Sequence, residues 1–384
     1  MVRVLILNTD YEAFLEDLYA ENPGLADQSY DQQMAVRNRS LFGAADFYSQ
    51  GLKANAVEAA DIHLNNRAMQ LRWAAEHGVI VPATDKPEPK GVAAKLRRLI
   101  RGSKELNPQL AAMPGWTRSV MIAQIEAFRP DVILNQAMHL VGAESLRSLV
   151  GERCLLVGQI AAPWHAPEDD LAYDLIVTSL PNFVQQFERR GIRTFYNQLG
   201  FAPNVLASVP EAERDLAVTF VGSLSAHHAE RIRLLEYLAA RTRLNVWGMG
   251  IEEVSEQSPI RRCHRGQAWG REMFSIFRRS QIVINQHIGI AGGFANNMRL
   301  YEATGCGATL VTDRKTNLPE LFDVGSEVVD YGNVEECLAR IEGLLSEPAR
   351  CAVIGSRGQA RTCSGHTYVQ RTAELKAKFA EMLN

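Results

Sequence analysis

The sequence predicts an α/β protein built from two doubly wound parallel sheets that face each other across a cleft. Short apolar runs recur along the chain with helical stretches between them, and a second series of the same kind starts at residue 216. Continuous apolar runs are typical of strands buried on both faces, and strands that alternate with helices indicate parallel sheets covered on both sides. At 384 residues the chain is too long for one ordinary core, which favours two domains.

The first series predicts an N-terminal Rossmann-like domain over residues 1–203. Its expected strands are 2–8, 61–66, 131–136, 154–160, 174–179 and 194–200. Its expected helices include 67–77, 117–128 and 181–190.

The second series predicts a C-terminal Rossmann-like domain over residues 204–365. Its expected strands are 216–223, 243–250, 280–286, 307–313 and 327–332, with helices at 228–241, 269–279, 296–304 and 333–346. The stretch 200–215 has two prolines and no periodicity, so we expect a linker there. The tail is helical, and we expect its last piece, 366–384, to cross back onto the first domain. In such sheets ligands bind at the carboxyl ends of the strands.

Composition excludes several classes of protein. Hydrophobic residues make up 46% of the chain, charged residues 22%, and the net charge is −3, which argues against a nucleic-acid-binding protein. The six cysteines are scattered without metal-ligand spacing. The N-terminal apolar run is too short for a signal peptide, and no run approaches the ~20 apolar residues of a membrane span. We therefore expect a cytoplasmic protein.

Residues 82–116 form a basic insertion in the first domain. Val92 to Ile100 has the pattern of a short basic amphipathic helix. Such a surface at 90–104 fits peripheral contact with anionic lipid at the inner face of the membrane. A solvated helix explains the pattern as well, and we favour that interpretation.

Two stretches of the second domain could bind an anion. In "TFVGSLSAHHAERIRLL" (219–235), a strand leads through Gly222 and Ser223 to a helix start near His228 and Arg231. The unpaired N–H groups of a helix start attract anions. Any strand-to-helix crossover needs a turn, however, so this stretch alone fits a structural role.

The second stretch is "GIAGGFANNMRLYEATGCGATLVTD" (289–313). Gly293 and its neighbours let a ligand approach the backbone, and Asn296 or Asn297 can cap the following helix. Arg299 and Glu302 share a helix face and could simply form an i,i+3 ion pair. Because buried-strand patterns flank the helix, it starts where such folds bind ligands. A carboxylate there can accept two hydrogen bonds from a vicinal diol and an arginine can neutralise a diphosphate, which together describe a nucleotide sugar.

Taken in order, five motifs resemble the GT-B glycosyltransferases of the group 1 type, especially their divergent spore-maturation-type branch. They are "FVGSLS", "SQIVINQH", "NNMRLYEATGCGATLVTD", "LPELFDVGSEVVDY" and "HTYVQRT", and the resemblance covers about 216–375. It implies that Glu302 holds the ribose of the donor nucleotide and that Asn297 and Arg299 lie near the diphosphate. It also implies that Gly222 and Ser223 touch phosphate.

The sequence departs from the family pattern at two places. Phe294 occupies the position of a second glutamate found in many retaining members, so retention and inversion both stay open. Ser223 and His228 replace the usual arginine and lysine of the glycine loop, so Arg231 or Arg299 must meet the phosphate charge. The fold group generally works without metal, and no Asp-x-Asp stands at a strand end. We therefore expect no metal and no cofactor beyond the donor.

An inverting reaction needs a base for the acceptor hydroxyl. The candidates are Asp10, His139 and His165, each just after a predicted strand. Asp10 could instead cap a helix, and either histidine could be a packed loop residue.

The sequence thus predicts a metal-independent glycosyltransferase that moves a sugar from a nucleotide-diphosphate sugar to a hydroxyl of a glycan, lipid-linked glycan or protein. We expect the second domain to bind the donor and the first the acceptor. The alternatives are a nucleotide-sugar epimerase or hydrolase on the same fold, or a catalytically silent nucleotide-binding assembly factor.

Overall fold

The structure is a computed structural model that describes residues 1–82, 110, 112–164, 169–225 and 228–384. The predicted basic helix at 92–100, the predicted membrane-contact segment 90–104 and His165 lie outside the described residues. Among the residues that are described, no helix combines the length and the apolarity needed to cross a membrane.

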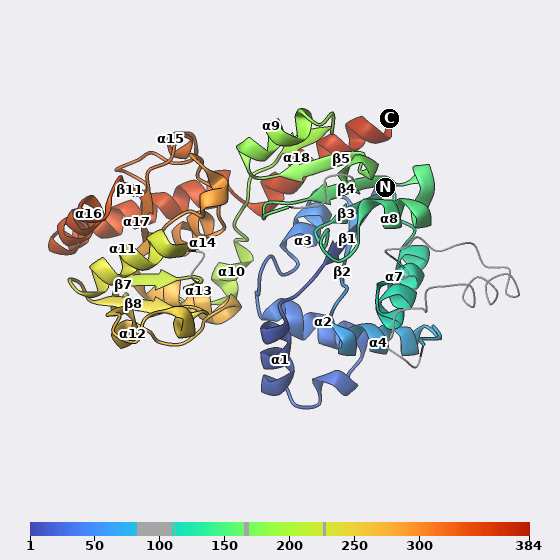
Figure 1. The fold of residues 1–384 in the computed structure, drawn as a ribbon, viewed down its shortest axis with the longest axis horizontal. Coiled ribbons are helices and arrows are strands. Elements are labelled where there is room, and N and C mark those ends of the chain that lie inside the picture. Colours follow the sequence, from blue (N-terminus) through green and yellow to red (C-terminus); the bar gives the residue numbers. More distant parts are fainter. Residues whose placement is uncertain (83–109, 111, 165–168, 226–227) are drawn as a thin grey trace, which may run out of the picture.

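The chain forms two lobes, each built on a parallel sheet (Figure 1). The first sheet has six strands in the order β2-β1-β3-β4-β5-β6. Its strands are β1 (Arg3–Asn8), β2 (Glu58–His63), β3 (Val132–Asn135), β4 (Leu155–Gln159), β5 (Leu175–Thr178) and β6 (Thr194–Tyr196). The second sheet has five strands in the order β11-β10-β9-β7-β8. These are β7 (Leu216–Val221), β8 (Leu244–Trp247), β9 (Ser280–Asn285), β10 (Thr309–Asp313) and β11 (Val329–Tyr331).

Helices cover both faces of each sheet. Those up to β6 are α1 (Glu12–Glu21), α2 (Tyr30–Arg39), α3 (Phe47–Ala54), α4 (Arg67–Glu76), α7 (Gly115–Phe128), α8 (Ala143–Val150) and α9 (Pro181–Glu188). Those after β6 are α10 (Asn204–Ser208), α11 (Ala229–Ala239), α12 (Ile260–Cys263), α13 (Gly270–Arg279), α14 (Arg299–Gly305), α15 (Leu318–Leu321), α16 (Val334–Ser346), α17 (Pro348–Gly365) and α18 (Tyr368–Leu383). Short 3-10 turns lie at η1 (Leu25–Asp27), η2 (Gly151–Arg153), η3 (Asp169–Ala172), η5 (Ile251–Glu253) and η6 (Gly289–Ala291).

Alternation along the strands explains why both faces are covered. In β1, Val4 and Ile6 pack on the side of α3 and α18, whereas Leu5 and Leu7 pack on the side of α7 and α8. Successive side chains of a strand point to opposite faces, so an unbroken apolar run supplies two cores at once. Because both faces of each sheet are apolar, polar side chains can lie close together only at the ends of the strands, such as their carboxyl ends.

Two predicted strands differ from those observed. The strand expected at 61–66 is β2, which ends at His63 because Asn66 caps α4 by accepting a hydrogen bond from the N–H of Met69. The strand expected at 194–200 stops at Tyr196, because the residues after it leave the sheet and cross to the second lobe.

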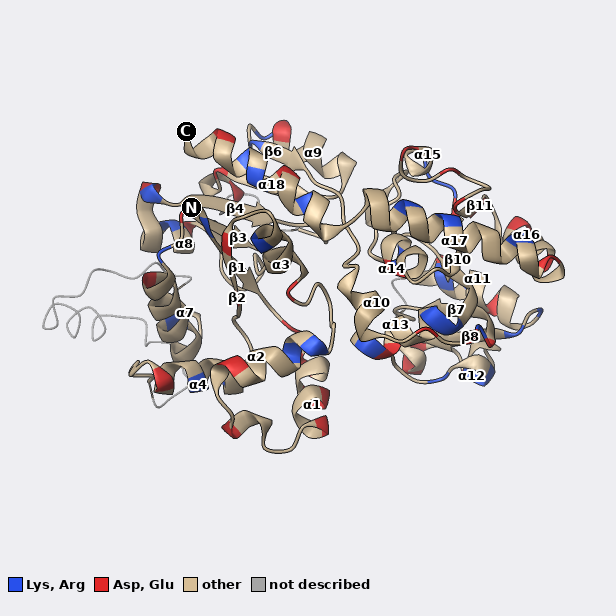
Figure 2. Ribbon diagram, turned by 180° about the vertical axis from the view of Figure 1, so that it is seen from behind, with Lys and Arg blue, Asp and Glu red and all other residues tan. Residues whose placement is uncertain are grey.

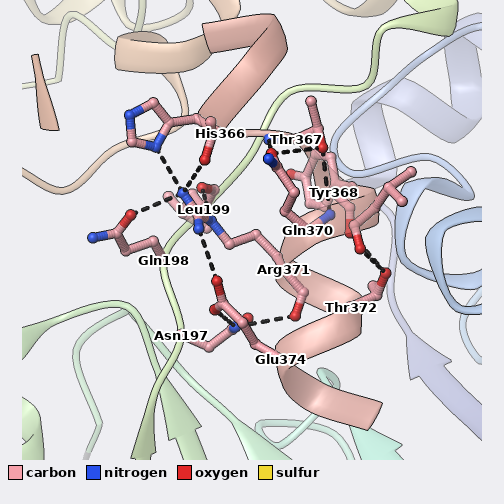
Figure 3. Close-up of polar contacts among 12 residues, drawn as sticks. Asn197, Gln198, Leu199, His366, Thr367, Tyr368, Gln370, Arg371, Thr372 and Glu374 are labelled. Atoms are coloured by element: carbon pink, nitrogen blue, oxygen red, sulfur yellow. Dashed lines mark hydrogen bonds and ion pairs between the residues drawn. The ribbon is translucent and has the colours of Figure 1, made fainter. Parts of the chain in front are cut away.

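The chain crosses between the lobes twice, and the two crossings lie side by side (Figure 3). The N–H of Phe201 donates to the carbonyl of His366 at 2.8 Å, and the N–H of Tyr368 donates to the carbonyl of Phe201 at 3.0 Å. Arg371, which is buried, donates to the Leu199 carbonyl at 3.1 Å and to Nδ1 of His366 at 2.7 Å. After this junction α18 packs along α3 in the first lobe (Figure 1).

Candidate active site

A cavity of about 610 Å³ lies between the carboxyl ends of the two sheets. From the first lobe it is lined by Asn8, Thr9, Tyr11, Arg37, Phe42, Gly43, Ala44, Ala45, His63 and Gln136. From the second lobe it is lined by Val221, Gly222, Ser223, Gly248, Met249, Gln267, Ala268, Trp269, Gly270, Met273, Met298, Arg299 and Glu302. Its size is that of a pocket for one small organic ligand, typically about 300–1,000 Å³. We call this cavity the cleft.

Two glycine turns form part of the second-lobe wall. The Gly222 turn follows β7 and the Gly248 turn follows β8, and the N–H of Leu224 donates to the carbonyl of Met249 at 2.8 Å. A Cβ added to Gly248 would lie 1.8 Å from the carbonyl oxygen of Gly222. Only a glycine fits there, so the two turns approach each other closely and leave backbone groups facing the cleft.

The predicted pair of Arg299 and Glu302 also lines the cleft. Arg299 donates to Oε2 of Glu302, and its guanidinium carbon lies 4.9 Å from the ring centre of Phe277. Burial raises the pKa of Glu302 above its ordinary value, although the charge of Arg299 opposes that rise. The i,i+3 ion pair that the sequence analysis gave as the purely structural alternative is present, but it lies in the cleft wall rather than on an outer surface.

Arg231 lies behind this wall and is not part of the cleft lining. It donates to the carbonyl of Ser223 at 3.0 Å and to the carbonyl of Gln286 at 3.1 Å. Burial, together with the positive charge of Arg299, lowers the pKa of Arg231 to about 10. No carboxylate among the described residues forms an ion pair with it. Arg231 therefore fixes the Ser223 turn and adds positive charge to the wall.

The remaining predicted donor residues support the loop rather than line the cleft. Asn297 donates to Oδ1 of Asn285 at 2.8 Å and accepts from the N–H of Leu300 at 3.2 Å. The Gly293 carbonyl accepts from the N–H of Thr316 at 2.9 Å. His228 stands at the N-terminal end of α11. The structure thus brings together Gly222, Ser223, Arg299 and Glu302 at the cleft, while Arg231, Asn297, Gly293 and His228 lie outside its lining.

The first-lobe wall contains a buried charged triad of Asp10, Arg37 and His63. Arg37 donates to Oδ1 of Asp10 at 2.5 Å, and Nδ1 of His63 lies 3.1 Å from Oδ2 of Asp10. Both ring nitrogens of His63 are buried, and neither has a hydrogen-bond partner within the described part of the chain. Burial alone would raise the pKa of Asp10, but His63 and Arg37 together hold it well below its ordinary value.

This geometry adds a candidate base to the predicted ones and counts against Asp10. Asp10 does not line the cleft, and a carboxylate with a lowered pKa accepts a proton poorly. His63 and Arg37, which the sequence analysis did not select, do line it. His63 ends β2, whereas the strand expected at 61–66 placed it inside the strand, so only the correct strand end would have selected it. His139 is exposed, packs against Trp164 with ring centres 4.9 Å apart and does not line the cleft.

The lobes touch on both sides of the cleft. The N–H of Arg271, at the start of α13, donates to the carbonyl of Ser40 at 2.7 Å. On the opposite side, Asn182 donates to the carbonyl of Ile290 at 3.0 Å, and Ala291 is buried in the apolar core of the first lobe. The lobes are therefore in contact at two places, the start of α13 and η6.

Comparisons with known proteins agree with this architecture. Residues 230–377 match the family model described as glycosyl transferase-like. The structure of HepE from Anabaena in complex with UDP-glucose superposes with a TM-score of 0.59 at 14% identity, over 99% of this chain and 100% of that one. Sucrose-phosphate synthase from Thermosynechococcus elongatus gives 0.58 at 9% identity, over 100% and 99%. A glycosyltransferase from Rickettsia africae gives 0.57 at 10% identity, over 100% and 99%. Comparison with curated protein sequences gives no match.

The predicted fold class is confirmed, because two parallel sheets with helices match GT-B structures along the whole chain. The chain therefore has the GT-B fold, and its residues 230–377 are similar to the glycosyl transferase-like family.

Proposed function

We propose that this protein transfers a sugar from a nucleoside diphosphate sugar, held by the second lobe, to a hydroxyl of an acceptor presented by the first lobe. One observation carries the proposal: a cleft between the lobes brings the Arg299–Glu302 pair together with His63 and Arg37. The acceptor is a glycan, free, lipid-linked or protein-attached. HepE, which has the same fold, has been seen with UDP-glucose, so UDP is the first nucleotide to test.

On the donor side, each group has a distinct task. Glu302, whose Oε2 accepts from Arg299, offers its second oxygen to the ribose diol. The Gly222–Ser223 turn and Arg299 meet the diphosphate, and Arg231 fixes that turn from behind. When the bond between the anomeric carbon and the diphosphate breaks, its electron pair passes to the diphosphate oxygen. Preorganised positive groups stabilise that developing charge, so we propose that no metal is required.

On the acceptor side, we propose that His63 rather than Asp10 is the base. Its partnerless Nε2 takes the proton of the acceptor hydroxyl as the oxygen forms its bond to the anomeric carbon. The Asp10 carboxylate at Nδ1 holds the ring and stabilises the imidazolium, and Arg37 holds Asp10. This arrangement corresponds to inversion, which proton NMR of the newly formed anomeric centre tests directly. Retained configuration would remove His63 from this role.

Nucleotide binding is the first test. We expect UDP, or another member of a panel with GDP, dTDP and CMP, to raise the melting temperature, because a ligand that binds only the folded state stabilises it by mass action. Glu302→Ala should abolish the shift. Glu335→Ala, which removes an exposed glutamate of α16, is the matched control and should keep it. A panel without any shift would overturn the proposal.

Metal independence has its own test. Release of free nucleotide from the donor sugar should continue at an unchanged rate in excess EDTA. If activity disappears in EDTA and returns with Mg²⁺, the arginines do not suffice to stabilise the leaving diphosphate.

Three further predictions stand beside the proposal. The cytoplasmic location, the peripheral membrane contact through 90–104 and the place in the spore-maturation-type branch rest on sequence pattern. Sedimentation with anionic liposomes at low salt tests the membrane contact, and protein that stays in the supernatant would contradict it.

A further inference from the structure

A second cavity adjoins the cleft between the lobes. Its volume is about 770 Å³. From the first lobe it is lined by Phe14, Asp17, Leu18, Glu21, Asn22, Val36, Arg39, Ser40 and Phe42, and from the second by Gln267, Trp269, Gly270, Arg271, Glu272 and Ser275. We call it the α1–α13 groove. It shares Phe42, Gln267, Trp269 and Gly270 with the cleft, so a ligand that leaves the cleft past Trp269 enters the groove.

Aromatic rings form the common wall of the two cavities. Phe42 stacks on Phe14 with ring centres 3.9 Å apart, and Trp269 meets Phe42 edge-on at 6.0 Å. Tyr11, on the cleft side, meets Phe42 edge-on at 5.4 Å and is 63% exposed. The C–H face of a pyranose ring is apolar and packs on such rings, while its hydroxyls bind the polar groups around them.

The wall is held rigidly. A Cβ at Gly270 would lie 2.1 Å from the carbonyl oxygen of Ser40, and the backbone there has φ +52°. Together with the hydrogen bond from the N–H of Arg271 to Ser40, this contact fixes Trp269 against the first lobe. A preorganised aromatic wall loses little freedom when a ligand binds.

The charged side chains that line the groove indicate which kind of ligand it binds. Asp17, Glu21 and Glu272 form no ion pair with a described residue, and Figure 2 shows acidic residues along α1. Two arginines, Arg39 and Arg271, line the same groove. Three carboxylates against two arginines disfavour a polyanionic ligand and suit hydroxyl-rich neutral ones, which both kinds of group can bind.

We propose that the α1–α13 groove is an acceptor subsite and that the acceptor is a neutral oligosaccharide. Its terminal sugar lies in the cleft and the preceding sugars pack along Trp269 and between α1 and α13. This proposal rests on the proposed function, because the cleft must hold the reacting end.

The test measures binding of the full-length protein, with UDP present, to an array of neutral oligosaccharides and their monosaccharides, followed by calorimetry. At least one oligosaccharide should bind about tenfold or more tightly than its monosaccharide. Asp17→Arg combined with Glu21→Arg, on an exposed face of α1, should weaken that binding about tenfold or more, since both residues line the groove. Trp269→Ala should do the same through the loss of an aromatic contact, by about tenfold. Tyr237→Ala, an aromatic of α11 away from both cavities, is the control.

The outcomes separate the two proposals. If UDP still shifts the melting temperature but no oligosaccharide outbinds its monosaccharide, the groove proposal is overturned and the donor site stands. The groove proposal is also overturned, and the donor site stands, if anionic glycans bind more tightly than neutral ones. If oligosaccharides bind and no nucleotide does, the glycosyltransferase function fails and the acceptor proposal falls with it, although the groove still binds glycan.

Discussion

At the scale of single residues, the site depends on side chains whose charges are matched in pairs. Asp10 is buried between Arg37 and His63, while Glu302 is buried against Arg299. Arg37 and His63 line the cleft while Asp10 lies behind them, whereas both Arg299 and Glu302 line it. Removing one member of a buried pair is costly, because the other charge is left without compensation.

The first prediction concerns His63. His63→Gln keeps a polar side chain of similar size but removes the proton acceptor, so we expect kcat to fall by about 10²–10⁴ with little change in donor KM. Asp10→Asn should also lower kcat, with a changed pH profile, because the ring loses its charged partner. Normal turnover in His63→Gln would exclude His63 as the base. A substitution such as Gln136→Glu cannot serve as the control, because Gln136 lines the same cleft.

The second prediction concerns Gly248. Gly248→Ala places a methyl group against the Gly222 carbonyl, and overpacking of this kind costs about 1–3 kcal/mol. We expect a lower melting temperature and weaker nucleotide binding, because the Gly222 turn must move. Gly343→Ala is the matched control: its Cβ would meet nothing within 4 Å, and alanine in a helix interior is favoured by about 0.5–1 kcal/mol. Equal melting behaviour of the two variants would contradict the tight approach of the turns.

At the scale of elements, the last helix belongs to the core of a lobe far from it in sequence. Leu375 and Phe379 of α18 are fully buried in the same cluster as Val4 and Ile6 of β1. The helix therefore closes one face of the first sheet (Figure 1). The N-terminal lobe is complete only when the C-terminal end of the chain has folded onto it.

The third prediction follows from that packing. Phe379→Ala should destabilise the protein by about 3–5 kcal/mol, the usual cost of removing a large buried side chain. Urea unfolding followed by circular dichroism measures it. Leu383→Ala, on the same helix and with Leu383 41% exposed, is the control and should change the unfolding free energy little. A small effect of Phe379→Ala would mean that α18 is docked only loosely.

Among the elements, the strands follow sequence pattern best, because most of them carry apolar runs. Every strand in the described part of the chain overlaps its predicted range. The helices α1, α2 and α3 were not predicted, because a helix such as α2, "YDQQMAVRNR", shows no clear apolar stripe. Its position depends on a capping box at Ser29 and on polar contacts such as Arg37 with Asp10.

At the scale of the whole molecule, the two lobes are joined by a polar junction rather than by a single flexible linker. Arg371 reaches the Leu199 carbonyl on one crossing and Nδ1 of His366 on the other (Figure 3). Nε2 of His366 is 2.8 Å from the Leu321 carbonyl, which ties the junction to α15 of the second lobe. Substitutions that remove these contacts should therefore alter the placement of one lobe relative to the other.

The fourth prediction concerns the pH dependence of this junction. Burial lowers the pKa of His366 from 6.5 to about 4, with the charges of Arg371 and Arg361 acting in the same direction. The folded state thus binds fewer protons than the unfolded state between these values, so this residue's contribution to stability is present above pH 6.5 and is lost as pH falls towards about 4. At about pH 4.5, acid should lower the unfolding free energy of the wild type more than that of His366→Gln, by on the order of 2 kcal/mol.

Urea unfolding at several pH values between about 7 and about 4.5 measures the difference between the two proteins. His139→Gln, which removes an exposed histidine, is the matched control. A constant difference between wild type and His366→Gln over this range would show that the junction tolerates a charged imidazole.

The sequence by itself determined the fold class, the order of the strands along the chain and several residues that line the cleft. Continuous apolar runs and glycine turns act locally, so Gly222, Ser223, Arg299 and Glu302 could be selected from pattern and lie at the cleft. Only the tertiary structure brought Arg37 and His63 to Asp10, because those residues lie on different elements and meet through the packing of α2 and β2 against β1. It also set the groove beside Trp269 and the junction at Arg371, since contacts between segments distant in the chain leave no periodic signal in the sequence.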